Sequence, residues 1–408
     1  MNTRGLSFTV FLGALSALPP LSIDMGLPGV PAIEAGMPGA AGRGALTLSL
    51  FLAGFALSPL ACGPLADRFG RRKTTAVGLF AFVLAATACV FAQSFSLLLG
   101  CRLVQGIAAG ACVIMPLAIV RDVFDGNAAR HHLSRITAVV GLAPMLAPLL
   151  GGWVMAAGGW RAIYAAQAAC GIALLATTLL LFAETLPASR RRSLNPRALL
   201  AGYASVVRDR GFRGNTLLYA FAFAAMFSFI SSAPAVLMGR LGLSPAMFGL
   251  AFAISSCGTL LGSLLSGRLN ARDIAGHTLV DAGIAGLVAA CLVLLALTLA
   301  GVVHVYTVVP VVAVAIFCFG LLGPSANHDA LHNLAGVAGS ASGILRCTQM
   351  VLGALASALV AYFSPLADPT LTMAGLMAAA SLAAAACLVR LRVGTRRASS
   401  QMPAGDLQ

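Results

Sequence analysis

Residues 63–73 read Gly63-Pro64-Leu65-Ala66-Asp67-Arg68-Phe69-Gly70-Arg71-Arg72-Lys73. Four basic residues and one acid lie within the last seven positions of this stretch, and long apolar runs precede and follow it. A short charged segment between two apolar runs indicates a tight loop that holds two membrane helices at a water-facing edge. The stretch therefore predicts a protein that crosses a membrane several times.

The composition of the whole chain supports this interpretation. Of its 408 residues, 59% are hydrophobic and 9% are charged, whereas an ordinary soluble domain has about 25% charged residues. The formal net charge is +14. Because the basic residues lie in short loops between apolar runs and not on one polar face, we exclude a nucleic-acid-binding protein. Basic residues beside membrane spans are instead typical of topology signals and of contacts to anionic lipid head groups.

The apolar runs are long enough to cross a bilayer. A spanning helix needs about 20 predominantly apolar residues, and backbone groups in lipid must pair within the segment, so each such run is expected to be a helix. Twelve segments qualify: 7–27, 46–65, 75–93, 97–119, 135–155, 161–183, 214–236, 246–267, 279–300, 305–327, 340–363 and 371–391. The predicted fold class is an all-α polytopic membrane protein.

The basic residues are distributed unequally over the loops. If the N-terminus is inside, nearly all of the 26 Lys and Arg residues fall on the cytoplasmic side, and only Arg43, Arg161 and Arg240 fall on the opposite side. The remaining two, Arg102 and Arg346, lie within spans. Since cytoplasmic loops of membrane proteins carry an excess of basic residues, we expect both termini to be cytoplasmic.

The longest polar segment, 184–213, has six spans on each side. This layout is typical of a transporter that has two helix bundles and a binding site between them. We therefore predict an N-terminal six-helix bundle at 1–187, a cytoplasmic linker loop at 188–213, and a C-terminal six-helix bundle with a short cytoplasmic tail at 214–408.

Polar residues in two of the spans are candidate functional residues. Arg102 and Gln105 lie in the fourth span, and Asp24 lies near the outer end of the first. An ionisable side chain inside a membrane is expensive and marks a functional site by default. A carboxyl group in apolar surroundings favours its protonated form, so it can take and release a proton near neutral pH. The alternatives are a snorkelling arginine near a helix end and an interfacial acid.

The fifth span is rich in small residues and proline. Small residues let two helices approach closely, and prolines bend helices. The residues of this pattern are Gly141, Pro144, Pro148, Gly151 and Gly152. A general packing face between helices is the alternative to a functional motif.

Together these motifs resemble those of the major facilitator superfamily, and most of all its twelve-span drug/proton antiporters of the bicyclomycin- and chloramphenicol-resistance type. The resemblance covers nearly the whole chain. It implies that the stretch at 63–73 latches the two halves together in the outward-facing state, that Arg102 takes part in proton coupling, and that the span-five pattern is an antiporter motif. The latch residues are Gly63, Asp67, Arg68, Gly70, Arg71 and Arg72.

The resemblance implies proton-driven export of small amphipathic drugs by alternating access, in a bacterial inner membrane. Asp24 would carry the proton, Arg102 would tune Asp24 or its relay electrostatically, and Gln105 would hydrogen-bond the substrate or the backbone. The expected partners are the drug, protons and the lipid bilayer. We expect no cofactor and no metal ion, and we expect the protein to work as a monomer.

Two other functions remain open at this point. The first is transport of one specific metabolite, such as a sugar or an amino acid, on the same fold. The second is a polytopic membrane enzyme, for which His328 and His332, four residues apart beside Asp329, are the one weak candidate site. A phosphate-binding loop for ATP is excluded because it requires a Gly-Lys pair, and arginine precedes Lys73, the one lysine of the chain.

Overall fold

The structure is a computed structural model that describes residues 6–191 and 196–400, and these residues form helices joined by short connections. The first half contains α1 (Leu6–Asp24), η1 (Leu27–Gly29), α2 (Val30–Gly36), α3 (Leu46–Phe69), α4 (Arg71–Val90), α5 (Phe95–Val123) and α6 (Gly126–Leu180). The linker contains η2 (Ala188–Arg190) and α7 (Pro196–Arg208). The second half contains α8 (Arg210–Ala233), η3 (Pro234–Arg240), α9 (Pro245–Asn270), α10 (Gly276–Leu299), α11 (Val305–Leu331), η4 (His332–Val337), α12 (Ala338–Phe363) and α13 (Pro369–Ser400).

The prediction of twelve spanning helices is confirmed once α6 is divided. Eleven continuous helical segments are long and apolar enough to cross a membrane. One of them, α6, has 55 residues, about 80 Å at 1.5 Å per residue, which exceeds the roughly 30 Å hydrocarbon core. Its backbone leaves the helical conformation at Gly159, where φ is 72° and ψ is −174°. The positive φ favours glycine, and the break divides α6 into two spanning helices.

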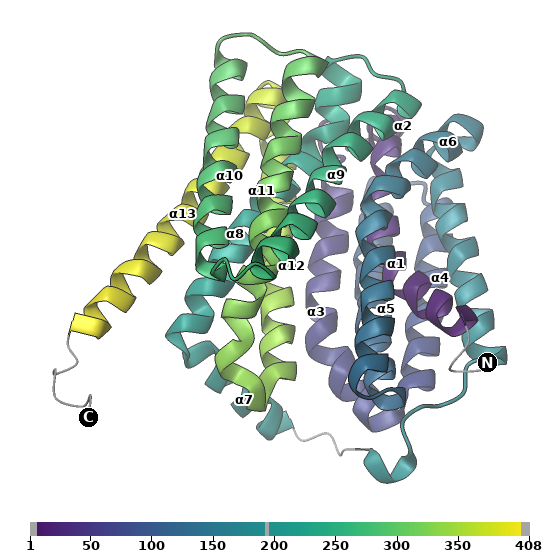
Figure 1. Cartoon of the computed structure of the whole chain (residues 1–408). Coiled ribbons are helices and arrows are strands. Elements are labelled where there is room, and N and C mark those ends of the chain that lie inside the picture. The colour runs from purple at the N-terminus through teal and green to yellow at the C-terminus, as the bar shows by residue number, and fades with distance from the viewer. Residues whose placement is uncertain (1–5, 192–195, 401–408) are drawn as a thin grey trace.

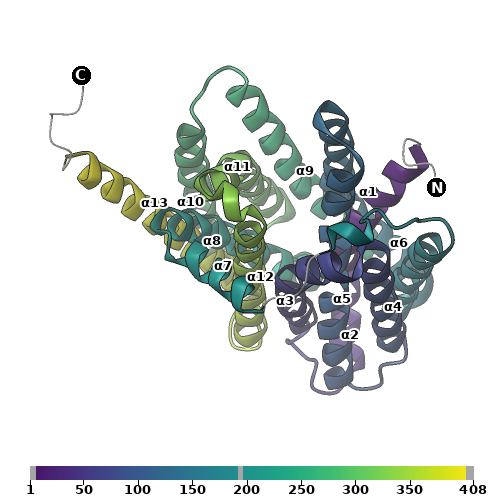
Figure 2. The ribbon, with the colours of Figure 1, turned by 90° about the horizontal axis from the view of Figure 1, so that it is seen from below.

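The helices form two groups that stand side by side (Figures 1 and 2). Helices α1 and α3 to α6 pack mainly on one another, and α8 to α13 do the same. Between the groups, α3 packs on α12 and α6 packs on α9. The end of the bundle with α7, at the bottom of Figure 1, is called the linker side here, and the end with α2 is called the far side.

Glycines set the closest contacts within each group. In lipid, helices associate through close packing and not through the hydrophobic effect, so small residues lie at their contacts. A Cβ atom on Gly106 of α5 would lie 2.8 Å from the carbonyl carbon of Phe51 on α3. In the second group, a Cβ atom on Gly258 of α9 would lie 2.6 Å from the carbonyl oxygen of Ala313 on α11. The pairs α3–α5 and α9–α11 are thus packed in the same way.

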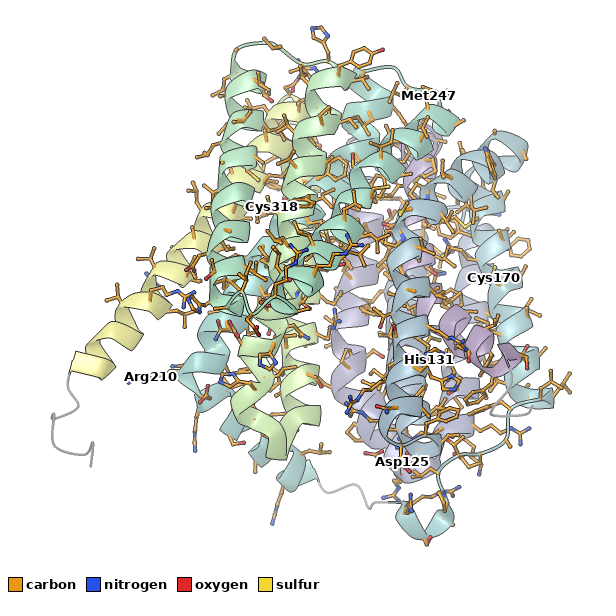
Figure 3. The ribbon with its side chains drawn as sticks, in the orientation of Figure 1. Asp125, His131, Cys170, Arg210, Met247 and Cys318 are labelled. Atoms are coloured by element: carbon orange, nitrogen blue, oxygen red, sulfur yellow. The ribbon has the colours of Figure 1, made fainter. Side chains whose placement is uncertain are left out.

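The lateral surface of the bundle is apolar. Large hydrophobic side chains such as Val77 and Phe80 on α4 are more than half exposed. Figure 3 shows carbon-rich side chains over the sides of the bundle, while the labelled Asp125 and Arg210 lie in its lower part. Exposed apolar sides with polar residues toward an end fit a protein surrounded by lipid.

The interpretation of residues 63–73 as a loop is wrong for most of the stretch. Helix α3 continues to Phe69 and α4 begins at Arg71, so Gly70 alone breaks the helix. Gly70 has φ 96° and ψ 160°, a conformation available essentially to glycine, whereas Gly63 is helical. A charged helix end and one glycine therefore replace the expected turn, and Asp67 and Arg71 bond each other across this glycine.

The linker contains a helix that the sequence reading missed. Val206 of α7 is fully buried in a cluster with Phe212 and other residues of the second half. The Tyr203 hydroxyl donates to the carbonyl oxygen of Leu60 on α3 at 3.0 Å. In a regular helix that carbonyl would accept from residue 64, but Pro64 has no N–H. Helix α7 therefore contacts both halves on the linker side, and its apolar residues at helical spacing were the available signal.

Candidate functional site

A buried polar network surrounds Arg102 on the far side of the first half. The Arg102 guanidinium donates to the Thr47 carbonyl (3.2 Å), the Ser22 carbonyl (3.3 Å) and the side-chain oxygen of Gln105 (2.7 Å). The Gln105 amide donates to the side-chain oxygen of Gln167 at 2.9 Å. The Gln167 amide donates to the same Ser22 carbonyl at 3.4 Å. The network closes on itself and joins α1, α3, α5 and the second part of α6.

The positive charge of Arg102 is held by neutral groups. The side chain is 2% exposed, and its guanidinium carbon lies 4.4 Å from the ring centroid of Phe51 and 5.6 Å from that of Tyr164. Ring faces and carbonyl oxygens stabilise a cation without neutralising it. No carboxylate pairs with Arg102 within residues 6–191 and 196–400. Arg102 is thus a packed and bonded residue that does not snorkel to water, and its field is available to a negative group.

Arg102 borders a small pocket between the two halves. This pocket of about 10 Å³ is lined by Arg102 and Tyr164 of the first half and by Ser231 of α8. A cavity of about 380 Å³ adjoins it on the far side and shares Val30, Ala45 and Ser231 with it. A cavity of this size suits a small molecule. The Ser231 hydroxyl is buried and has no hydrogen-bond partner in the described part of the chain, so it is free to bond a molecule in this space.

Asp24 is buried beside this network but does not join it. It ends α1 and is 4% exposed, and its carboxyl group makes no hydrogen bond or ion pair with any residue that the structure describes. Arg102 bonds the carbonyl of Ser22, two residues earlier in α1, so the two ionisable groups are connected through this helix. Asp24 does not line the pocket beside Arg102. The predicted set of Asp24, Arg102 and Gln105 is therefore one bonded pair and one nearby acid without a partner.

The sequence reading missed two residues of this region. Gln167 closes the network, and a single glutamine inside the apolar run 161–183 was the available signal. Glu34 of α2 is half-buried, lines the larger cavity and accepts from the Gly44 N–H at 2.7 Å. It was missed because α2 extends the first apolar segment to Gly36, beyond its predicted end at residue 27.

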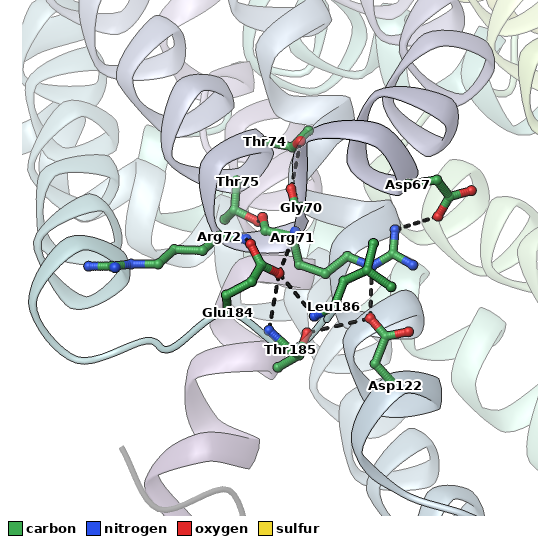
Figure 4. Close-up of polar contacts among 10 residues, drawn as sticks. All are labelled: Asp67, Gly70, Arg71, Arg72, Thr74, Thr75, Asp122, Glu184, Thr185 and Leu186. Carbon is green, nitrogen blue, oxygen red and sulfur yellow. Dashed lines mark hydrogen bonds and ion pairs between the residues drawn. The ribbon is translucent and has the colours of Figure 1, made fainter. Parts of the chain in front are cut away.

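The charged stretch on the linker side forms a second polar cluster (Figure 4). The Arg71 guanidinium donates to Asp67 on α3 at 2.7 Å and to Asp122 at the end of α5 at 2.8 Å. The Thr185 hydroxyl also donates to Asp122, at 3.4 Å. Arg68 is exposed and lies over the Phe69 ring. Of the predicted latch residues, Arg71 and Asp67 are thus bonded to each other, and Arg68 lies apart from them.

Glu184, which follows α6, caps the N-terminus of α4. Its carboxylate accepts from the backbone N–H of Arg71 at 2.8 Å and of Arg72 at 3.2 Å. An acid at a helix N-terminus satisfies free N–H donors and is favoured by the helix dipole. A Cβ atom on Gly70 would lie 2.8 Å from the carboxyl carbon of Glu184, so glycine is needed here for space as well as for its φ. Within the described residues, the polar partners of this cluster all belong to the first half.

Replacing Arg71 by alanine should destabilise the protein strongly. The change leaves Asp122 and Asp67 without their counter-ion, and removing one partner of a largely buried charge pair costs roughly 3 kcal/mol. The melting temperature in detergent should therefore fall by several degrees. Arg68→Ala is the matched control and should shift it little, since Arg68 is exposed and lacks a carboxylate partner. Equal shifts for the two variants would contradict the assigned role of the cluster.

The span-five residues lie at contacts between helices. A Cβ atom on Gly152 would lie 2.6 Å from the Pro245 carbonyl oxygen of α9, in the second half. A Cβ atom on Gly151 would lie 3.0 Å from the Met25 carbonyl carbon, next to Asp24. Gly141 is looser, with its nearest neighbour at 3.7 Å. Pro148 is buried and Pro144 half-buried, and α6 continues through both prolines.

Two groups of spanning helices, with buried ionisable residues beside a cavity between them, define a membrane transporter. Residues 4–358 match the model of the Major Facilitator Superfamily. The chain belongs to this superfamily and is a multi-pass membrane transporter, not an enzyme.

Known proteins similar to this chain agree with that assignment. It is 30% identical over 359 residues to the uncharacterized MFS-type transporter YdgK of Bacillus subtilis (strain 168), covering 87% of this chain and 88% of YdgK. It is 30% identical over 249 residues to the multidrug resistance protein MdtL of Escherichia coli O9:H4 (strain HS), covering 61% of this chain and 63% of MdtL.

Solved structures show the same fold at low identity. A bacterial homologue of the human lysosomal transporter Spinster has a TM-score of 0.69 and 17% identity over 95% of both chains. A D-xylose-proton symporter has a TM-score of 0.67 and 14% identity, over 93% of this chain and 97% of the symporter. At this identity the likeness supports the fold alone.

Proposed function

We propose that this chain exports small amphipathic drugs or antibiotics in exchange for protons, by alternating access. The two helix groups act as bundles, at about residues 1–187 and 214–408, that rock around the cavity between them. The observation that carries this proposal is the pocket at their interface, which is lined both by a buried Arg102 without a carboxylate partner and by Ser231 of the other half. The name of the relative MdtL supports drugs as the substrate class.

Asp24 is the proton carrier in this proposal. A buried carboxylate without a polar partner is unfavourable, so Asp24 holds its proton while it is enclosed and releases it when water reaches it. Movement of the bundles changes that access. Arg102 is bonded to α1 two residues from Asp24, and in this proposal it tunes that acid electrostatically. Gln105 keeps the Arg102 guanidinium in place, and the larger cavity accepts the apolar part of the drug.

The other two motifs serve the movement. The Arg71 cluster keeps α3, α4 and α5 together at the linker side, and the antiporter motif keeps α6 close to α9 at the far side. We further propose that the protein works as a monomer in a bacterial inner membrane. Both termini lie in the cytoplasm in this proposal, since nearly all basic residues outside the spans fall on one side of the predicted topology.

Everted membrane vesicles from a host without its own major exporters test this function. An acid-inside pH gradient is formed and followed with a fluorescent dye, and drugs, sugars and amino acids are added in turn. We expect the gradient to fall when an amphipathic drug is added, and the same host to become resistant to that drug. A response to one sugar or amino acid, and to no drug, would support the metabolite transporter instead.

A further inference from the structure

The second half contains a copy of the Arg102–Gln105 pair. Arg346 and Gln349 of α12 have the same spacing, and Arg346 donates to the side-chain oxygen of Gln349 at 3.4 Å. Arg102 makes the same contact to Gln105 at 2.7 Å. Arg102 lies near the start of α5 on the far side, whereas Arg346 lies near the start of α12 on the linker side. The two pairs are therefore in opposite halves and toward opposite ends of the transporter.

Helical geometry directs Arg346 into the space between the halves. Gly343 of α12 has α3 as its nearest neighbour, and Gly353 has Phe223 of α8. At about 100° per residue, Arg346 lies about 60° from Gly343 and about 20° from Gly353 around the helix. It lies about 140° from Val351, on the exposed apolar face of α12. Arg346 is exposed, and its position around α12 lies on the side of α3 and α8 and not on the exposed apolar face.

The copy in the second half is incomplete. The amide nitrogen of Gln105 donates to Gln167, whereas the buried amide nitrogen of Gln349 has no partner in the described residues. The orientation of this amide follows from chemistry, because Arg346 is only a donor and must face the oxygen of Gln349. A buried donor without an acceptor is unfavourable. Apart from the Asp24 carboxyl, the other buried side-chain groups without partners in the described chain are Ser and Thr hydroxyls.

We propose that Arg346 and Gln349 form a second substrate site on the linker side, which binds an oxygen acceptor of the substrate. Suitable acceptors are carbonyl, nitro, sulfonyl and carboxylate groups. No carboxylate pairs with Arg346 in the parts of the chain that the structure covers, so this site excludes lipophilic cations by repulsion. The proposal rests on the proposed function and defines its substrates as neutral or anionic amphipathic molecules.

Two variants test this site with two probes in the vesicle assay. The probes are chloramphenicol, which is uncharged and carries nitro and carbonyl oxygens, and the lipophilic cation tetraphenylphosphonium. Arg346→Gln removes the positive charge, and Gln349→Leu removes the amide N–H group that has no acceptor. Each should raise the KM for chloramphenicol about tenfold or more, since hydrogen bonds to charged or buried groups are lost. Arg390→Gln changes an exposed arginine of α13 and should leave KM unchanged.

Each outcome decides the proposal. If the parent exports chloramphenicol and both variants retain its KM, the second site is refuted while the proposed function stands. If the parent exports the cation as well as chloramphenicol, the charge selectivity is refuted. If the parent moves neither probe nor any other drug, the proposed function and this site fall together. Gel filtration of each variant confirms that a change in KM comes from a folded protein, and Gln349→Leu decides the question if Arg346→Gln does not fold.

Discussion

Asp24→Asn should abolish proton-driven export without weakening the fold. Asparagine has the shape of the protonated acid but cannot release a proton, so the export cycle stops at the step where the carrier deprotonates. Because Asp24 is 4% exposed and no described residue bonds its carboxyl group, the change replaces a buried neutral acid by an amide of the same shape and breaks no side-chain hydrogen bond. Loss of transport together with equal or higher stability is therefore expected.

The measurement is the drug-induced loss of the pH gradient in everted vesicles, with the melting temperature in detergent beside it. The response should fall below a tenth of the parent's, and drug movement that persists should no longer depend on pH. Asp125→Asn is the matched control, because Asp125 is exposed at the start of α6 and makes no capping hydrogen bond. Vesicles of Asp24→Asn that respond to drug like those of Asp125→Asn would remove Asp24 from proton coupling.

The spans were predictable because lipid imposes a simple requirement on each one separately. An apolar run of about 20 residues is sufficient, whatever lies beside it. The helix end at Phe69 was not predictable in the same way. The charged residues of 63–73 suggested a loop, but Arg71 is bonded to Asp122, more than fifty positions later in the sequence. A partner on another helix changed the local preference, and a single sequence does not show such partners.

The residues of the candidate site were likewise predictable from the sequence only in part. Arg102 and Asp24 stood out because charge inside a span is expensive. Gln167 and the Ser22 carbonyl did not, because an amide and a backbone group become notable only when four helices bring them to Arg102. The antiporter motif predicted close packing, yet it did not indicate that Gly152 contacts the other half of the protein.

Gly106→Ala should destabilise the protein more than any other glycine-to-alanine substitution in the first half. The new Cβ atom would lie 2.8 Å from the Phe51 carbonyl carbon and 3.0 Å from the Phe55 nitrogen. These are backbone atoms of α3, so no side chain can move aside and the whole helix must shift. Overpacking of a tight core costs about 1–3 kcal/mol, and we expect a value at or above the upper end of this range.

The same shift should also stop transport, because α3 supplies both the Thr47 carbonyl and the Phe51 ring that hold Arg102. Gly100→Ala makes the identical change six residues earlier in α5, where nothing lies within 4 Å. Since alanine favours a helix over glycine by about 0.5–1 kcal/mol, this control should be neutral or slightly more stable. Detergent melting temperatures and vesicle transport are measured for both. A Gly106→Ala protein that melts and transports like Gly100→Ala would show that α3 and α5 are not in close contact at this point.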